Sequence, residues 1–84
     1  METKEIIYCL KKIVKPYVQN DLAFQEFGKD TDFVRDLEIN SANLVDIVLD
    51  VEDEFDIAID NESMDSMLTV QDAVHIIKQK QKEQ

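Results

Sequence analysis

Hydrophobic residues recur at helical spacing in three stretches of the chain, and this pattern predicts three main helices. The first runs from about Thr3 to Tyr17, the second from Ser41 to about Asp56, and the last starts at Thr69. Apolar residues three and four positions apart share one side of a helix, where a core can bury them. The positions expected to be buried are Ile6, Leu10, Ile13, Val14 and Tyr17, then Leu44, Ile47, Val48, Val51 and Phe55, then Val70, Ala73, Val74, Ile76 and Ile77.

A long connection, from Gln19 to Ile39, joins the first two predicted helices. It contains the only glycine, Gly28, but also many large apolar residues. Those residues are Leu22, Phe24, Phe27, Phe33, Val34 and Leu37. A loop with this composition must be ordered against the core, and it has room for a helical turn of its own.

The segment between the second and last helices is shorter and is predicted to contain one more helix. Ile57-Ala58-Ile59 alternates like a strand but has no partner strand, so we expect an apolar loop that enters the core. Asn61 to Met67 is predicted to be a short helix, with Met64, Met67 and Leu68 facing inward. The chain is therefore predicted to be all-α, a small four-helix bundle in a single domain over residues 1–84, with three main helices, one short helix and a long first loop.

Two helix starts have residues suited to capping. Asn40 is a good N-cap residue, and Asn43 stands where a capping box places its reciprocal partner. Ser41 is thereby expected at a solvent-facing helix start, where unpaired N–H groups and the helix dipole favour a bound phosphate. Thr69 and Asp72 resemble a capping box for the last helix.

The charge of the chain is large and uneven. The net charge is −10, and no Lys or Arg occurs between Asp36 and Ile77. Such a surface repels nucleic acid and anionic lipid and should attract basic protein partners. Acidic residues late in the second helix oppose its dipole, so their placement indicates something other than stability.

Other functional classes lack the residues they need. No apolar run could span a membrane, and the start, from Met1 to Glu5, lacks the order of a signal peptide. Cys9 is the only cysteine, which excludes an internal disulfide and fits a reducing cytoplasm. It is expected to be a small buried hydrophobic residue rather than a reactive thiol. His75 is alone and expected at a helix surface, and the acidic clusters lack EF-hand spacing, so no metal site is expected. No acid–base pair or activated nucleophile is present, so the chain is not expected to be an enzyme.

Three segments resemble the acyl carrier protein family, and the likeness extends over nearly the whole chain. Residues 36–42, which include Ser41, resemble the family's Asp-Leu-Gly-x-Asp-Ser-Leu segment. Residues 52–59 are similar to its acidic-Phe-x-Ile-x-Ile run, and residues 69–74 look like the start of its last helix. The three segments at family spacing are far more specific than the short serine motif alone.

The resemblance implies a monomeric carrier with a 4′-phosphopantetheine arm on Ser41. A phosphopantetheinyl transferase would attach the arm from coenzyme A, and the arm's thiol would hold acyl groups as thioesters. The partners would be acyl-transferring and condensing enzymes of fatty acid, polyketide or related lipid synthesis, with no nucleic acid and no membrane insertion. Asn40 and Asn43 would contact the transferase, and the acidic contacts for basic partner surfaces would be Asp46, Glu52 and Asp53.

Four residues depart from the family pattern and leave alternatives open. Asn40 replaces the usual Asp, Ala42 replaces Leu, Glu38 stands in place of Gly, and Asp60 stands where Pro is frequent. These changes favour a specialised carrier with dedicated partners over a primary fatty-acid carrier. A peptidyl, aminoacyl or D-alanyl carrier would use the same arm. An unmodified carrier-like adaptor is a further alternative, which Asn40 and Ala42 favour.

Overall fold

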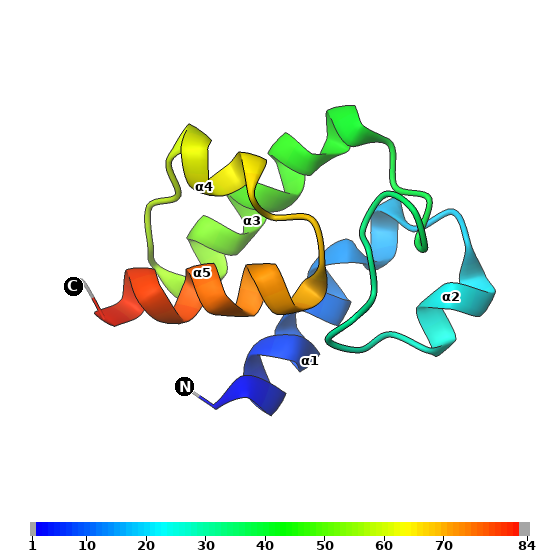
Figure 1. Cartoon of the computed structure of the whole chain (residues 1–84), viewed down its shortest axis with the longest axis horizontal. Coiled ribbons are helices and arrows are strands. Elements are labelled where there is room, and N and C mark those ends of the chain that lie inside the picture. Colours follow the sequence, from blue (N-terminus) through cyan, green and yellow to red (C-terminus); the bar gives the residue numbers. More distant parts are fainter. Residues whose placement is uncertain (1, 83–84) are drawn as a thin grey trace.

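The computed structural model describes residues 2–82, and over that range the chain is helical with no strand. The helices are α1 (Thr3–Val14), α2 (Asp21–Gln25), α3 (Leu44–Phe55), α4 (Asn61–Asp65) and α5 (Val70–Lys82), with 3-10 turns at Lys15–Tyr17 and Ser41–Asn43. The predicted all-α class with three long helices is confirmed, and the helical turn allowed in the first connection is α2 (Figure 1). No helix in the described range is long and apolar enough to cross a bilayer.

The long helices α1, α3 and α5 enclose the core, with α1 in contact with both of the others (Figure 1). Their expected buried positions are confirmed, except that Ile13, Tyr17 and Leu44 are only partly buried. The first connection adds Phe33, Leu37 and Ile39, all of which have almost no exposed surface. That connection therefore forms part of the core, as its composition predicted.

The first helix ends earlier than its apolar pattern suggested. The α-helical part stops at Val14, and the next three residues, which include Pro16, form a 3-10 turn. Proline has no N–H to donate, and its ring clashes with the carbonyl four residues earlier, so it cannot continue an α-helix. The tighter 3-10 turn carries the chain past this point.

Three apolar residues expected on the core are exposed instead: Leu22, Val34 and Leu68. Helix α2 is one short turn that packs Ala23 and Phe24 inward, so Leu22 falls on its outer side. Val34 sits in a turn whose N–H groups are held by the Asp32 carboxylate. These positions depend on how the backbone is tied down, which the spacing of apolar residues does not encode.

Backbone hydrogen bonds fix the long first connection to the start of α5. The N–H of Phe33 donates to Leu68 O at 3.1 Å, and the N–H of Val70 donates to Thr31 O at 2.9 Å. The N–H of Gln71 donates to Lys29 O at 2.8 Å. With the backbone at Leu68 committed to this pairing, its side chain points to solvent, which explains the wrong prediction for that residue.

The capping box predicted for the last helix is confirmed. The N–H of Thr69 donates to Asp72 Oδ2 at 3.0 Å, and the N–H of Asp72 donates to Thr69 Oγ1 at 3.2 Å. Each side chain thus satisfies an N–H group that the first helical turn leaves without a backbone acceptor. His75, farther along α5, is exposed as expected.

Candidate functional site

Ser41 begins a 3-10 turn that leads directly into α3. The residue is exposed, and its hydroxyl has no hydrogen-bond partner among residues 2–82. The predicted helix start at Ser41 is thus a start of helical backbone, but the α-helix itself begins three residues later, at Leu44. In Figure 1 this segment is the green start of α3 at the upper edge of the view. The hydroxyl is therefore presented to solvent at the end of a rigid element.

Asn40 holds the backbone of this turn. Its Oδ1 accepts a hydrogen bond from Ala42 N–H at 3.0 Å, and its carbonyl oxygen accepts one from Asn43 N–H at 2.8 Å. The prediction that Asn40 caps the helix start is confirmed. The reciprocal bond predicted from the Asn43 side chain is absent in the described range, where that half-buried residue makes no side-chain cap. The tight turn already binds Asn43 through its N–H group, and its side chain is shorter than the usual Glu or Gln.

One expectation about the serine was wrong. Apart from the N–H group capped by Asn40, the helix start at Ser41 was expected to have unpaired N–H groups that favour a bound phosphate. The structure gives each an acceptor, because Leu44 N–H donates to Ser41 O and the two before it donate to Asn40. A phosphate on the Ser41 hydroxyl would therefore be favoured by the positive end of the α3 dipole rather than held by direct N–H bonds.

No base is in place to activate Ser41. Its hydroxyl accepts no hydrogen bond from His and donates none to a carboxylate among residues 2–82. Within the same residues, no group of three or more His, Cys, Asp or Glu side chains could hold a metal ion. An exposed hydroxyl without a base suits the acceptor of a group that another protein transfers, and the residues around Ser41 leave room for such a group.

The outer side of α3 continues from this turn and carries the predicted acidic contacts. Asp46 and Asp53 are exposed, and neither makes a side-chain hydrogen bond within the described range. Asp50 accepts a hydrogen bond from the Tyr17 hydroxyl at 3.4 Å. Partial burial and the nearby Asp50 and Asp46 carboxylates raise the pKa of Tyr17, so this hydroxyl remains a donor at neutral pH.

Glu52 differs from its acidic neighbours, because the fold uses its carboxylate. Its Oε2 accepts a hydrogen bond from Ile59 N–H at 2.7 Å, and the side chain is half-buried. Its main-chain carbonyl also accepts the N–H of Ile57, at 3.2 Å. Glu52 therefore fastens the loop after α3 to the end of that helix. The loop enters the core as predicted, with Ile57 buried and Ile59 partly buried.

Two apolar side chains lie on the outer side of α3 that the sequence did not single out. Val45 is 49% exposed and Leu49 is 56% exposed, one helical turn apart. Together with Asp46 and Asp53 they form what we call the α3 surface. The available signal was their position, since both lie beside the buried stripe rather than in it. An apolar centre with a polar rim is the usual anatomy of a protein-docking surface, and here the polar neighbours are acidic.

Cys9 lies on α1, and its side chain serves in packing rather than in chemistry. It packs against the core but is only half-buried, whereas a buried position was expected. Burial, and next the nearby Glu54 carboxylate, raise the pKa of its thiol above the ordinary value. The thiol is therefore protonated at neutral pH and is a poor nucleophile.

Comparisons with known proteins agree with this geometry. Residues 17–77 match a family model described as a phosphopantetheine attachment site. The acyl carrier protein of Coprothermobacter proteolyticus is 36% identical over 78 residues, which cover 93% of each chain. That of Myxococcus xanthus is 36% identical over 74 residues, covering 88% of this chain and 91% of the relative. That of Nitratidesulfovibrio vulgaris is 36% identical over 63 residues, covering 75% and 83%.

The matched region contains the exposed serine, the turn that presents it and the whole of α3. The relatives are also similar to this chain in length, since each match covers most of both proteins that are compared. The chain belongs to the acyl carrier protein family, whose phosphopantetheine-attachment domain implies a covalently bound 4′-phosphopantetheine group.

Proposed function

We propose that Ser41 carries the 4′-phosphopantetheine arm and that the chain delivers acyl groups bound to it. The observation that supports this most directly is an exposed hydroxyl, unbonded among residues 2–82, in the 3-10 turn that leads into α3 and inside the matched region. When bound, the arm supplies a thiol that holds an acyl group as a thioester. The chain itself acts as a carrier rather than a catalyst, consistent with the absence of a base beside Ser41.

The residues around Ser41 have distinct parts in this proposal. Asn40 holds the turn through its two hydrogen bonds, so the hydroxyl projects from a fixed backbone. Asn40 and Asn43 would flank the arm and contact the transferase that attaches it. Ala42 is exposed and small, which leaves the base of the arm open on that side.

The test of attachment is the intact mass of the protein before and after incubation with coenzyme A and a phosphopantetheinyl transferase. We expect a gain of one phosphopantetheine unit. Ser41→Ala should gain nothing, and Ser66→Ala, a matched change at an exposed serine on another element, should gain the full unit. If the parent gains nothing with several transferases and carries no arm when isolated from its native cells, the proposal is wrong and the unmodified adaptor is favoured.

The second part of the proposal concerns the α3 surface. We infer that Asp46 and Asp53 face Lys and Arg on partner enzymes while Val45 and Leu49 supply apolar contact. The partners would be the transferase and the acyl-transferring and condensing enzymes of fatty acid, polyketide or related lipid synthesis. Glu52 would act in docking mainly through its position at the end of this surface, since one of its oxygens is already bonded.

Charge reversal on the α3 surface tests docking. Asp46→Lys and Asp53→Lys should each raise the KM of the transferase for this protein by about threefold to tenfold, because surface charges govern encounter with a basic partner. Glu26→Lys, an equal change at an exposed position outside this surface, should leave the KM within about twofold. An unchanged KM for both α3 variants would exclude this surface as the docking site.

The remaining parts of the proposal are the oligomeric state, the compartment and the group that the arm carries. A single carrier domain, active as a monomer in the cytoplasm, fits the one half-buried cysteine and the strong acidity. Mass spectrometry of the thioester on protein from native cells would identify the cargo. An acyl chain would support lipid or polyketide synthesis, and an amino acid would make the chain an aminoacyl or peptidyl carrier.

A further inference from the structure

The exposed side of α1 is mainly basic, in contrast to the rest of the molecule, and Glu5 is the one exposed acidic residue within the helix. Lys4, Tyr8, Lys12 and Lys15 are exposed, and Lys11 lies beside them, partly buried. Their spacing places Lys4, Tyr8, Lys11 and Lys12 on one side of α1, opposite the buried stripe, and Lys15 begins the 3-10 turn that follows. We call these five residues the α1 surface. It is a compact positive area on a chain of net charge −10.

The lysines of the α1 surface are not paired with carboxylates in the part of the chain that the structure describes. None of its four lysines forms a salt bridge with any of residues 2–82, although the chain contains 19 acidic residues. Lys12 Nζ instead lies 4.5 Å from the centre of the Tyr8 ring, and Lys11 Nζ lies 5.4 Å from that of Phe24. Like charges one turn apart cost an isolated helix a few tenths of a kcal/mol per pair. The helix dipole favours cations at the C-terminal end, where Lys11, Lys12 and Lys15 lie, but not Lys4 in the first turn.

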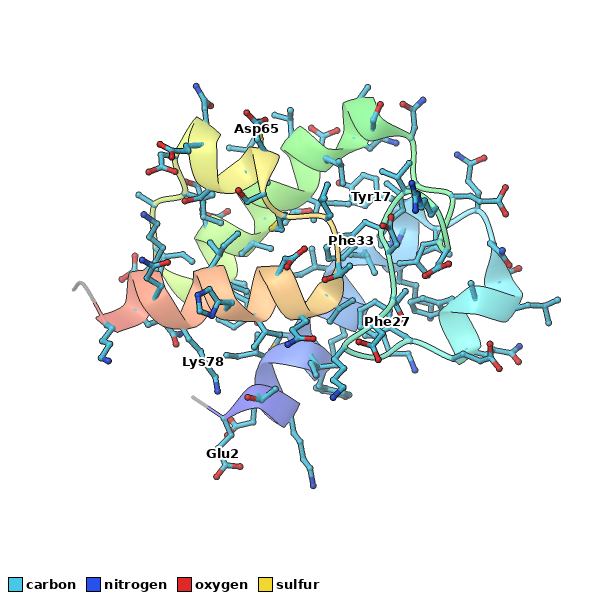
Figure 2. All side chains as sticks on the ribbon, in the orientation of Figure 1. Glu2, Tyr17, Phe27, Phe33, Asp65 and Lys78 are labelled. Carbon is cyan, nitrogen blue, oxygen red and sulfur yellow. The ribbon has the colours of Figure 1, made fainter. Side chains whose placement is uncertain are left out.

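An apolar hollow lies next to the α1 surface, between α1 and α5. Its volume is about 480 Å³, and its apolar lining comes from Ile7, Val74 and Ile76. Lys29 and Lys78 line the same hollow together with one acidic residue, Asp72. The Lys78 ammonium donates a hydrogen bond to the Thr3 hydroxyl at the start of α1, and the Asp72 carboxylate is already bonded to the N–H of Thr69. Figure 2 shows Lys78 and Glu2 on the lower side of the view, while Asp65 of α4 is on the upper side. More cations therefore border a place where an apolar side chain can be buried.

We propose that the α1 surface and this hollow together dock an acidic, amphipathic segment of a partner protein. Carboxylates of that segment would pair with the lysines, Tyr8 would supply a rigid aromatic contact, and an apolar side chain would enter the hollow. Tyr8 is 61% exposed, and tyrosine is enriched at the centres of protein interfaces. The surface extends from Lys4 to Lys15, about 16 Å along the helix, which suits a segment of about three turns.

The charge distribution favours a narrow protein segment over other anionic partners. Electrostatic interactions decay over a Debye length of about 10 Å, so a segment lying along α1 meets mainly its lysines. An anionic bilayer is a wide plane, and it would also meet the acidic remainder of the molecule. A second copy of the chain would bring together two molecules that each have a net charge of −10.

The proposal is tested with a defined acidic peptide and the full chain. The probe is a 16-residue capped peptide with Leu at every fourth position and Glu elsewhere, added to ¹⁵N-labelled protein. We expect amide shift changes concentrated in residues 3–15 and 74–78, and weaker binding when NaCl rises from about 50 to about 300 mM. Shift changes that are absent at millimolar peptide, or that centre on α3, would overturn the proposal.

Charge reversal at exposed lysines provides the matched comparison. Lys12→Glu and Lys15→Glu should each weaken peptide binding by about threefold, and the double variant by about tenfold. Arg35→Glu makes the same charge change at an exposed residue away from α1 and should stay within twofold of the parent. Far-UV circular dichroism of each variant checks that the helices persist. Equal losses for Lys12→Glu and Arg35→Glu would show that only net charge matters and would refute a specific surface.

Two further measurements separate this inference from its alternatives. Vesicles of phosphatidylglycerol should not bind the protein at salt concentrations where the peptide does, and tighter binding to the vesicles would assign the α1 surface to a membrane instead. Ser41→Ala should bind the peptide as the parent does, and Lys12→Glu should still accept the phosphopantetheine unit. The docking proposal and the attachment proposal can therefore fail independently.

Discussion

Glu38 has a backbone conformation that side chains other than glycine adopt at a cost. Its φ is 56°, in the left-handed region, where contact between Cβ and the carbonyl costs L-residues about 1–2 kcal/mol. The side chain is exposed and makes no hydrogen bond with any of residues 2–82. The strain occurs two residues before Asn40, in the segment that leads to the serine. Nothing in the packing around Glu38 requires a glutamate there.

Replacing Glu38 with glycine, but not with alanine, should therefore stabilise the protein. Glu38→Gly is expected to raise the free energy of unfolding by about 0.5–1 kcal/mol, because relief of strain exceeds the extra entropy of glycine in the unfolded chain. Urea denaturation measures this as a higher midpoint at unchanged slope. Glu38→Ala keeps the Cβ and should give no gain. A gain from alanine equal to that from glycine would show that the charge, not the backbone, is the cause.

At the scale of elements, the spacing of apolar residues predicted the features that are set by residues close together in the sequence. The three long helices, their buried stripes and the cap at Asn40 follow from contacts within four residues, and all are observed. The position of Leu68 did not follow, because it is set by hydrogen bonds to the first connection, more than thirty residues away. The exposure of Val45 and Leu49 likewise depends on which side of α3 packs against α1, a contact between helices about thirty residues apart.

The candidate site likewise has features that the sequence predicts and features that depend on contacts distant in sequence. The exposed hydroxyl of Ser41 was predictable from its place at a capped helix start. The paired N–H groups after it were not, because they require the 3-10 turn in place of an α-helical one. The bond between Glu52 and Ile59 depends on the path of the loop after α3. A sequence that is acidic throughout this stretch does not distinguish Glu52 from Asp53.

Glu52 should contribute to stability where its neighbour does not. Glu52→Ala leaves the Ile59 N–H without its charged acceptor and should cost about 1–2 kcal/mol, since bonds to charged groups are worth more than neutral ones. Asp53→Ala, at an exposed residue without a side-chain bond in the described range, should stay within about 0.5 kcal/mol of the parent. Urea denaturation of the three proteins checks this. Equal values for the two variants would show that the loop does not need the Glu52 carboxylate.

Over the whole molecule, the dominant electrostatic feature is repulsion among acidic groups. The net charge of −10 is carried by 84 residues, and the acidic side chains of α3 are mostly exposed. Repulsion of this kind opposes the compact state and is screened by salt. The protein is therefore expected to be least stable in dilute buffer at neutral pH.

Added salt should stabilise the fold. Raising NaCl from about 10 to about 300 mM is expected to increase the free energy of unfolding by about 1 kcal/mol, which for a domain of this size moves Tm by about 4–8 °C. Thermal denaturation followed by circular dichroism measures the change. A variant with both Asp46→Asn and Asp53→Asn carries less negative charge and should respond less. A Tm that falls with salt would mean that attractive charge pairs outweigh the repulsion.

The backbone hydrogen bonds between the first connection and the start of α5 also bear on how the chain reaches this structure. They join Lys29, Thr31 and Phe33 to residues about forty positions later. Contacts this distant in sequence form slowly, because a long loop must close before they repay its lost entropy. The helices can form from local contacts, but the bonds at Lys29, Thr31 and Phe33 can form only when the start of α5 reaches the first connection. The rate of folding should therefore depend on this closure more than on the helix propensity of α3.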